Sequence, residues 1–181
     1  GTYVAKPKAY QNVTRLQGFG EAMTPRGYET FARVLGTREV AADKQIAARL
    51  ALDADTPVIE IKRLRYLNRE PISLDVTYVP RAIGERLMKA DLATRDIFLI
   101  LENEYGFALG RAELHIEAVL ADDSLARLFG IAEGSPVLRI DRLVHTTAGE
   151  PIDYEHLYYR GDAFQYRLTI DRHHENKEAA P

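Results

Sequence analysis

Apolar residues recur along the chain at two spacings, and each spacing predicts one kind of secondary structure. Apolar and polar residues alternate over four stretches, which predict strands near residues 30–40, 58–67, 110–120 and 137–146. A tight turn and a second strand follow two of these stretches, so each of the two makes a β-hairpin. Helical spacing predicts short helices near residues 19–23, 83–88 and 97–105. Together they predict an α+β domain, with a largely antiparallel sheet of about six strands flanked by helices.

Two stretches of the chain, 46–63 and 125–142, resemble one another. The first reads IAARLALDADTPVIEIKR and the second reads LARLFGIAEGSPVLRIDR, with proline and arginine at the same spacing. In each copy an aspartate, Asp43 or Asp122, is placed to cap a short helix, and Gly130 is placed to end the second one. A hairpin follows each helix. We therefore expect an internal helix–hairpin repeat with pseudo-two-fold symmetry, since a solenoid would need more copies.

Two arginines, Arg63 and Arg65, share the strand face that begins with isoleucines in the first hairpin. An arginine that faces the core is unfavourable unless it is paired. Either the two arginines pair with carboxylates such as Asp75 or lie at a sheet edge, or they line a cavity that receives an anion. Guanidinium groups suit phosphate and carboxylate ligands. The repeat matches Arg63 with Arg142 but places Val144 at the position of Arg65, as expected if one off-axis site broke the symmetry.

The length of the hairpin turn decides whether Asp75 lies on that face. A two-residue turn pairs Leu67 with Glu70 and places Leu74 opposite Arg63, whereas a three-residue turn pairs Leu67 with Pro71 and places Asp75 there. We expect the three-residue turn, because it separates polar from apolar side chains more cleanly. The polar face would then hold Arg63, Arg65, Ser73, Asp75 and Thr77. The helix-packed face would hold Leu64, Tyr66, Ile72, Leu74 and Val76.

Two further segments are candidates for binding. Gly18 and Gly20 precede the first predicted helix, where free backbone N–H groups attract anions, although a glycine-rich turn is more often only a turn. The segment 154–166 holds five aromatic residues, which either wall a ligand pocket or pack across strands at a sheet edge. Within it, residues 160–162 read Arg-Gly-Asp and predict a turn rather than an adhesion sequence.

Composition excludes several classes of function. The chain has 24 basic and 27 acidic side chains and a formal net charge of −3, whereas a nucleic-acid-binding domain normally carries a basic excess. The absence of cysteine excludes disulfides, thiol nucleophiles and zinc–thiolate sites. No dinucleotide or P-loop motif, apolar run of about 18 residues or secretory signal is evident, so we expect a cytoplasmic domain without cofactor or metal. His115, His145 and His156 stand apart from any nucleophile, and His173 and His174 lie in a polar tail.

The motifs described above carry a family resemblance. The stretches LQGFGEAMTPRGY, RLRYLNREPISLDVTYVP and EPIDYEHLYYRGDAFQY occur in this order along the chain. In that order they resemble the effector-binding (UTRA) domain of GntR-superfamily transcriptional regulators of the HutC subfamily. The resemblance assigns residues 11–171 to that domain. It implies that residues 1–10 are the remnant of a linker and wing from a preceding winged-helix DNA-binding domain, and that residues 172–181 are a loose tail.

The resemblance also implies a fold, a function and a set of site residues. It implies a chorismate-lyase-like fold in a homodimer that binds a small anionic metabolite, either a sugar phosphate or an organic acid. Binding would alter how the N-terminal domains contact operator DNA. The effector-binding residues carried over are Gly18, Phe19, Gly20, Arg63, Arg65, Asp75, Glu155, Tyr158 and Tyr166. Asp75 stands where the family has glutamate, and Phe164 where it often has tyrosine, a role that Tyr158 or Tyr166 would take over. The alternative function on the same fold is a chorismate-lyase-type enzyme.

Overall fold

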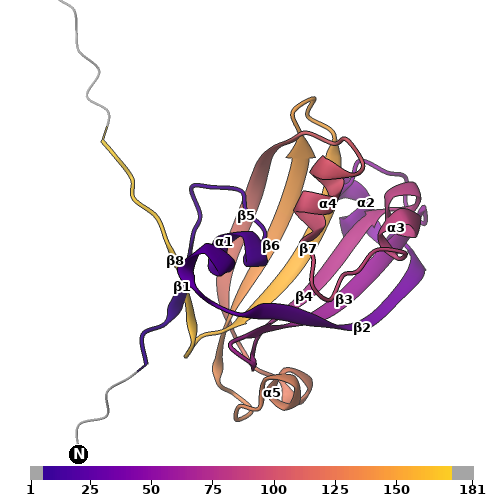
Figure 1. Ribbon diagram of the computed structural model, residues 1–181. Coiled ribbons are helices and arrows are strands. Elements are labelled where there is room, and N and C mark those ends of the chain that lie inside the picture. Colours follow the sequence, from indigo (N-terminus) through magenta and orange to yellow (C-terminus); the bar gives the residue numbers. More distant parts are fainter. Residues whose placement is uncertain (1–5, 173–181) are drawn as a thin grey trace, which may run out of the picture.

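A six-stranded antiparallel sheet forms the centre of the protein in the computed structural model, which describes residues 6–172 (Figure 1). The strands lie in the order β2-β3-β4-β7-β6-β5. Their bounds are Thr30–Ala41 (β2), Pro57–Leu67 (β3), Glu70–Pro80 (β4), Leu109–Leu120 (β5), Pro136–Thr146 (β6) and Pro151–Arg160 (β7). Two short strands, β1 (Ala9–Asn12) and β8 (Phe164–Arg167), pair in parallel beside this sheet. The α+β class with a largely antiparallel sheet of six strands is confirmed.

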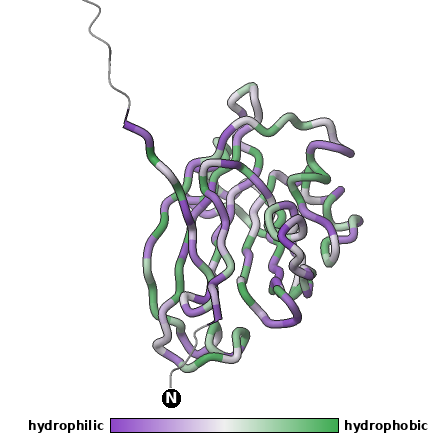
Figure 2. The backbone as a smooth tube through the Cα atoms, turned by 60° about the vertical axis from the view of Figure 1, so that its left-hand side comes forward, coloured by the Kyte–Doolittle hydropathy of each residue, from purple (hydrophilic) through white to green (hydrophobic). Residues whose placement is uncertain are grey.

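Between residues 6 and 172, five short helices cover the two faces of the sheet. They are α1 (Phe19–Met23), α2 (Lys44–Arg49), α3 (Arg81–Leu87), α4 (Ile97–Asn103) and α5 (Asp123–Phe129), with a 3₁₀ turn, η1 (Thr24–Arg26), after the first. Helices α1, α3 and α4 pack on the face that carries Ile59 and Ile61. Helices α2 and α5 pack on the opposite face, against Val58 and Leu64 respectively. Hydrophilic and hydrophobic residues are interspersed along the backbone in Figure 2, and the hydrophobic strand residues pack beneath the helices of one face or the other.

The helix ends follow the local rules that the sequence suggests. Asp43 Oδ1 accepts a hydrogen bond from the Ile46 amide, and Asp122 Oδ1 accepts one from the Leu125 amide, each at 2.8 Å. Gly130 ends α5 with a left-handed backbone at φ 65°. The element order β2-α2-β3-β4 in the first half is the same as β5-α5-β6-β7 in the second half.

The hairpin turn between β3 and β4 differs from our expectation. Asn68 and Arg69 form a two-residue turn with φ of 47° and 69°, and Leu67 pairs with Glu70 rather than with Pro71. A β-bulge at Ile72 then shifts the register by one residue, so Asp75 still lies opposite Arg63. The expected juxtaposition is confirmed, but the three-residue turn is wrong.

The bulge also moves Ile72 to the other face of the sheet. We expected Ile72 on the face that holds Leu64 and Leu74, which pack beneath α5. Instead Ile72 is 3% exposed and belongs to the apolar cluster around Phe19. A second bulge occurs at the matching position of the other hairpin, where Ile152 is skipped between Pro151 and Asp153. Each bulge shifts the alternation of side chains along its strand by one residue, and so changes which of them face α1 and α4.

The expected wing remnant falls largely on residues 1–5, and the expected tail on residues 173–181, both outside the described residues. The predicted turn at 160–162 is present, with Arg160 paired to Asp162. Of the helices between residues 6 and 172, none has the length and hydrophobicity needed to cross a bilayer.

Candidate functional site

Buried polar side chains gather on the sheet face that α1, α3 and α4 cover. They come from the middles of four adjacent strands, β3, β4, β7 and β6, where cross-strand pairing aligns Arg63 with Asp75 and Arg142 with Glu155. All are at least nine-tenths buried. The polar cluster, as we name it, consists of Arg63, Arg65, Ser73, Asp75, Thr77, Arg142, Asp153 and Glu155. The face predicted for the first hairpin is therefore polar and buried as expected.

Arg65 is paired with two carboxylates of the protein. Its Nε donates a hydrogen bond to Asp75 Oδ2 at 2.5 Å, and its Nη1 lies 3.6 Å from Asp96 Oδ1. Ser73 Oγ donates to the other oxygen of Asp75 at 2.9 Å. Burial alone would lower the pKa of Arg65, but the carboxylates of Asp75 and Asp96 outweigh it and raise the pKa. Of our two readings, pairing with a carboxylate therefore describes Arg65.

Arg63 has the opposite environment. It is 1% exposed, and its Nε and Nη1 have no hydrogen-bond partner within the part of the chain that the structure describes. Burial, together with repulsion from Arg65, lowers its pKa to about 10. A buried guanidinium with unused donors is unfavourable by itself, so it provides an incomplete site for an oxygen-bearing group.

The other end of the polar cluster combines a paired and an unpaired carboxylate. Arg142 Nε donates to Glu155 Oε2 at 2.5 Å, and the guanidinium of Arg142 lies 4.8 Å from the ring centroid of Phe98. Asp153 is fully buried, and neither of its carboxylate oxygens has a partner among residues 6–172. Burial, and repulsion from Glu155, raise the pKa of Asp153 well above its ordinary value. Asp153 is therefore ready to accept hydrogen bonds from a hydroxyl or amine, or to hold a proton when none is present.

The glycine loop lies beside this cluster, but its amides are already occupied. Gly20 N donates to Asp96 Oδ1 at 3.2 Å, and Glu21 N donates to Asp96 Oδ2 at 2.7 Å. Phe19 is buried, and the guanidinium of Arg65 lies 5.6 Å from the centroid of its ring. The predicted proximity of the loop to the arginines is thus present, with an internal carboxylate between them.

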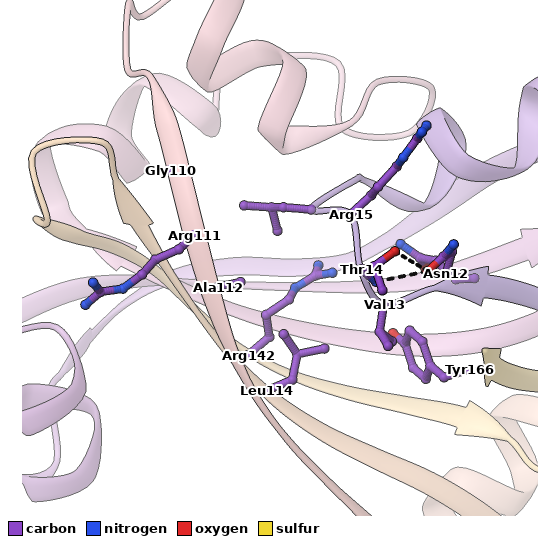
Figure 3. Close-up of a pocket in the computed structure, with 12 residues that line it drawn as sticks. Asn12, Val13, Thr14, Arg15, Gly110, Arg111, Ala112, Leu114, Arg142 and Tyr166 are labelled. Atoms are coloured by element: carbon purple, nitrogen blue, oxygen red, sulfur yellow. Dashed lines mark hydrogen bonds between the residues drawn. The ribbon is translucent and has the colours of Figure 1, made fainter. Parts of the chain in front are cut away.

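A cavity of about 260 Å³ opens at the Arg142 end of the polar cluster. It lies between the segment that follows β1 and strands β5 and β6, and Figure 3 shows the side chains of Arg142, Leu114 and Tyr166 directed toward one another. Arg111 points to the other side of β5 in that view. Two polar atoms at the cavity, Tyr166 Oη and Gln11 Oε1, are buried without partners in the described chain. The cavity therefore offers unused hydrogen-bonding groups next to the cluster.

The aromatic segment contributes less to the site than its density suggests. Strand β7 lies between β4 and β6, so the part of the segment that belongs to β7 is not at a sheet edge. Of the predicted site residues, Tyr158 lies away from the polar cluster, because it pairs with Leu74 and packs on the α5 face. Its neighbour Tyr159 takes the inward place and stacks on Phe164 with ring centroids 4.1 Å apart. Tyr166 meets these two rings edge-on, which positions its hydroxyl at the cavity.

The comparisons with known proteins agree with this architecture. A family model described as the UTRA domain matches residues 25–165. The chain belongs to the UTRA domain family. Its relatives are transcriptional regulators of the GntR and HutC type, as the resemblance implied.

Two curated relatives and one solved structure illustrate the likeness of this UTRA domain. It is 27% identical to the HTH-type transcriptional repressor NagR of Bacillus subtilis over 172 residues, which cover 95% of this chain and 70% of NagR. It is 23% identical to the mannosyl-D-glycerate transport/metabolism system repressor MngR of Escherichia coli, covering 95% of this chain and 71% of that protein. The effector domain of PhnF from Mycobacterium smegmatis has the same fold, with a TM-score of 0.82 at 20% identity, over 91% of this chain and all of that one.

Three residues of this UTRA domain's candidate site were not predicted from the sequence. Asp96 comes from the start of α4, Asp153 from β7 and Tyr159 from the same strand. Only the repeat carried a signal for any of them, because Asp153 occupies the position of Ser73 in the other hairpin. The three isolated histidines join no cluster of metal-ligating side chains between residues 6 and 172.

Proposed function

We propose that this UTRA domain is the sensor of a transcriptional regulator and binds a small anionic metabolite at the polar cluster and the adjoining cavity. The single observation that carries the proposal is Arg63, a fully buried cation whose Nε and Nη1 lack partners among the residues that the structure describes. A protein that only needed a stable core would gain by replacing such a group with an apolar one. A ligand oxygen beside Arg63 would supply the missing acceptor and offset the burial of its charge.

The unused groups define the chemistry of the ligand. Arg63 requires an anionic or strongly accepting oxygen, whereas the carboxyl group of Asp153, which holds a proton when no ligand is bound, offers one donor and free acceptor positions to hydroxyl or amine groups. The hydroxyl of Tyr166 and the amide oxygen of Gln11 add one donor and one acceptor at the cavity. A compact metabolite with one acidic group and several hydroxyl or amine groups would satisfy all four. Glu155 and Asp75, already paired with arginines, would orient those cations rather than bind the ligand alone.

Regulation follows from differential binding. We propose that the whole protein is a cytoplasmic homodimer whose N-terminal winged-helix domains contact a pseudo-palindromic operator. A ligand that binds one dimer arrangement more tightly than another shifts their populations, and the DNA-binding domains move with them. The formal net charge of −3 gives this domain no overall basic excess, in keeping with DNA contact elsewhere in the protein. The domain would bind its metabolite without converting it.

Calorimetry tests the proposal directly. The domain is titrated with pools of phosphorylated sugars, amino sugars, phosphonates and organic acids, alongside the variant Arg63→Met. We expect at least one pool to bind the wild type and to lose its binding in the variant. The absence of binding by every pool, or equal binding by the wild type and the variant, would refute a ligand site at Arg63. Product formation at enzyme-like rates in the same mixtures would refute a pure sensor and favour the lyase alternative.

A further inference from the structure

The carboxylate of Asp96 lies at the start of α1, between the backbone amides of the glycine loop and Arg65. Its two oxygens accept hydrogen bonds from the amides of Gly20 and Glu21, at 3.2 and 2.7 Å, and Arg65 Nη1 is 3.6 Å from Oδ1. Two amide donors and a guanidinium are the kind of contacts that hold a phosphate in proteins. Here a side chain of the domain itself receives them.

The glycine loop and the Asp96 carboxylate fit each other closely. A Cβ atom at Gly18 would lie 2.9 Å from Asp96 Cγ, and one at Gly20 would lie 3.0 Å from Asp96 Oδ2. Asp96 is only 8% exposed. The loop therefore has no room for a tetrahedral phosphate while the carboxylate is in place, and the two negative charges would repel each other.

Helix α4 holds Asp96 in this position. Asp96 immediately precedes the helix, and four of the next five residues are buried: Ile97, Phe98, Ile100 and Leu101. These side chains are part of the closely packed interior, so withdrawing Asp96 would require moving α4 out of the core. The carboxylate is thus a fixed part of the site rather than a loosely held substitute.

We infer that Asp96 is a specificity-determining residue, which excludes phosphate and phosphate esters from the loop side of the effector site. The inference rests on the proposed function and narrows it. Of the two ligand classes, sugar phosphates and organic acids, it selects organic acids. The acidic group of such a ligand meets Arg63, and the Arg65 side of the site stays neutralised by Asp75 and Asp96.

The test uses inorganic phosphate as the probe and the backbone amide resonances of Gly18, Gly20 and Glu21 as the readout. Wild type and Asp96→Ser are titrated with phosphate and followed by two-dimensional NMR. Asp122→Ser is the matched control, since Asp122 also precedes a helix but lies with α5 on the opposite face, where serine can still cap. We expect saturable shifts in Asp96→Ser, with an apparent Kd about tenfold or more below that of the wild type and the control.

Three results would overturn the inference or its basis separately. Phosphate binding by the wild type with an affinity equal to that of Asp96→Ser would show that the carboxylate excludes nothing. No phosphate shifts in a folded Asp96→Ser would show that the loop and Arg65 form no anion position. Should Asp96→Ser fail to fold, Asp96→Ala also removes the carboxylate and leaves its space empty, and the absence of phosphate shifts in a folded Asp96→Ala overturns the inference equally. Failure of the metabolite pools to bind the wild type would refute the proposed function instead, because the phosphate titration does not depend on it.

Discussion

Replacing Arg63 by methionine should stabilise the ligand-free domain while abolishing ligand binding. Burial holds the pKa of Arg63 near 10, below its ordinary value of 12.5. A lowered pKa means that the native state holds the charged arginine less favourably than the unfolded chain does, so the charge destabilises the fold at pH 7. At about 1.4 kcal/mol for each tenfold change, the difference corresponds to about 3 kcal/mol. Methionine has a similar length and adds no charge to the buried site.

Urea denaturation at pH 7, followed by circular dichroism, measures this effect. The free energy of unfolding of Arg63→Met should exceed that of the wild type by up to about 3 kcal/mol. Lys62→Met is the matched control, because Lys62 is the preceding residue of β3, points to the opposite face and has a side chain that is 45% exposed. We expect little change in that control. A loss of stability in Arg63→Met of the same size would refute the reasoning, since it would show that Arg63 is well paired without ligand.

Three further changes test other parts of the account. Arg65→Ala should destabilise the domain by about 3–5 kcal/mol in urea denaturation, because two buried carboxylates lose their cation; a loss below 1 kcal/mol would contradict the pairing described for Arg65. Asp153→Asn should raise the melting temperature at pH 7 but not near pH 4. Because the pKa of Asp153 is raised in the folded state, the wild type loses stability as the pH rises above about 4. An equal change in melting temperature at both pH values would contradict this explanation. Gly84→Ala should cost about 2 kcal/mol or more, since its Cβ would lie 2.3 Å from Ile59, whereas Gly36→Ala, with open space around it, should be nearly neutral by the same measurement.

The regular elements could be predicted from the sequence because their signals are local. Helix caps at Asp43 and Asp122 need only the residues of the following turn. Alternation defined the strands, and the separation of polar from apolar residues correctly placed Asp75 opposite Arg63. The path to that register was predicted wrongly, because a two-residue turn with a bulge at Ile72 produces the same alignment as a three-residue turn.

The rest of the site depends on contacts between distant segments. Asp96 accepts hydrogen bonds from the amides of Gly20 and Glu21, which lie 76 and 75 residues before it in the sequence. No local sequence pattern predicts such a contact. Which of the neighbours Tyr158 and Tyr159 faces the polar cluster depends on the phase with which side chains alternate between the two faces of β7. That phase is reset by the bulge at Ile152, which is visible only once the strands are paired. Sequence therefore indicated which strands carry the site but not which of their side chains complete it.

Binding of an organic acid at Arg63 is the central claim, and amide NMR of the wild-type domain titrated with pooled organic acids tests it most directly. We predict saturable shifts confined to the strands that hold Arg63, Asp153 and Arg142, and their loss in Arg63→Met. Shifts that persist unchanged in that variant, or that map only to the face covered by α2 and α5, would contradict the claim.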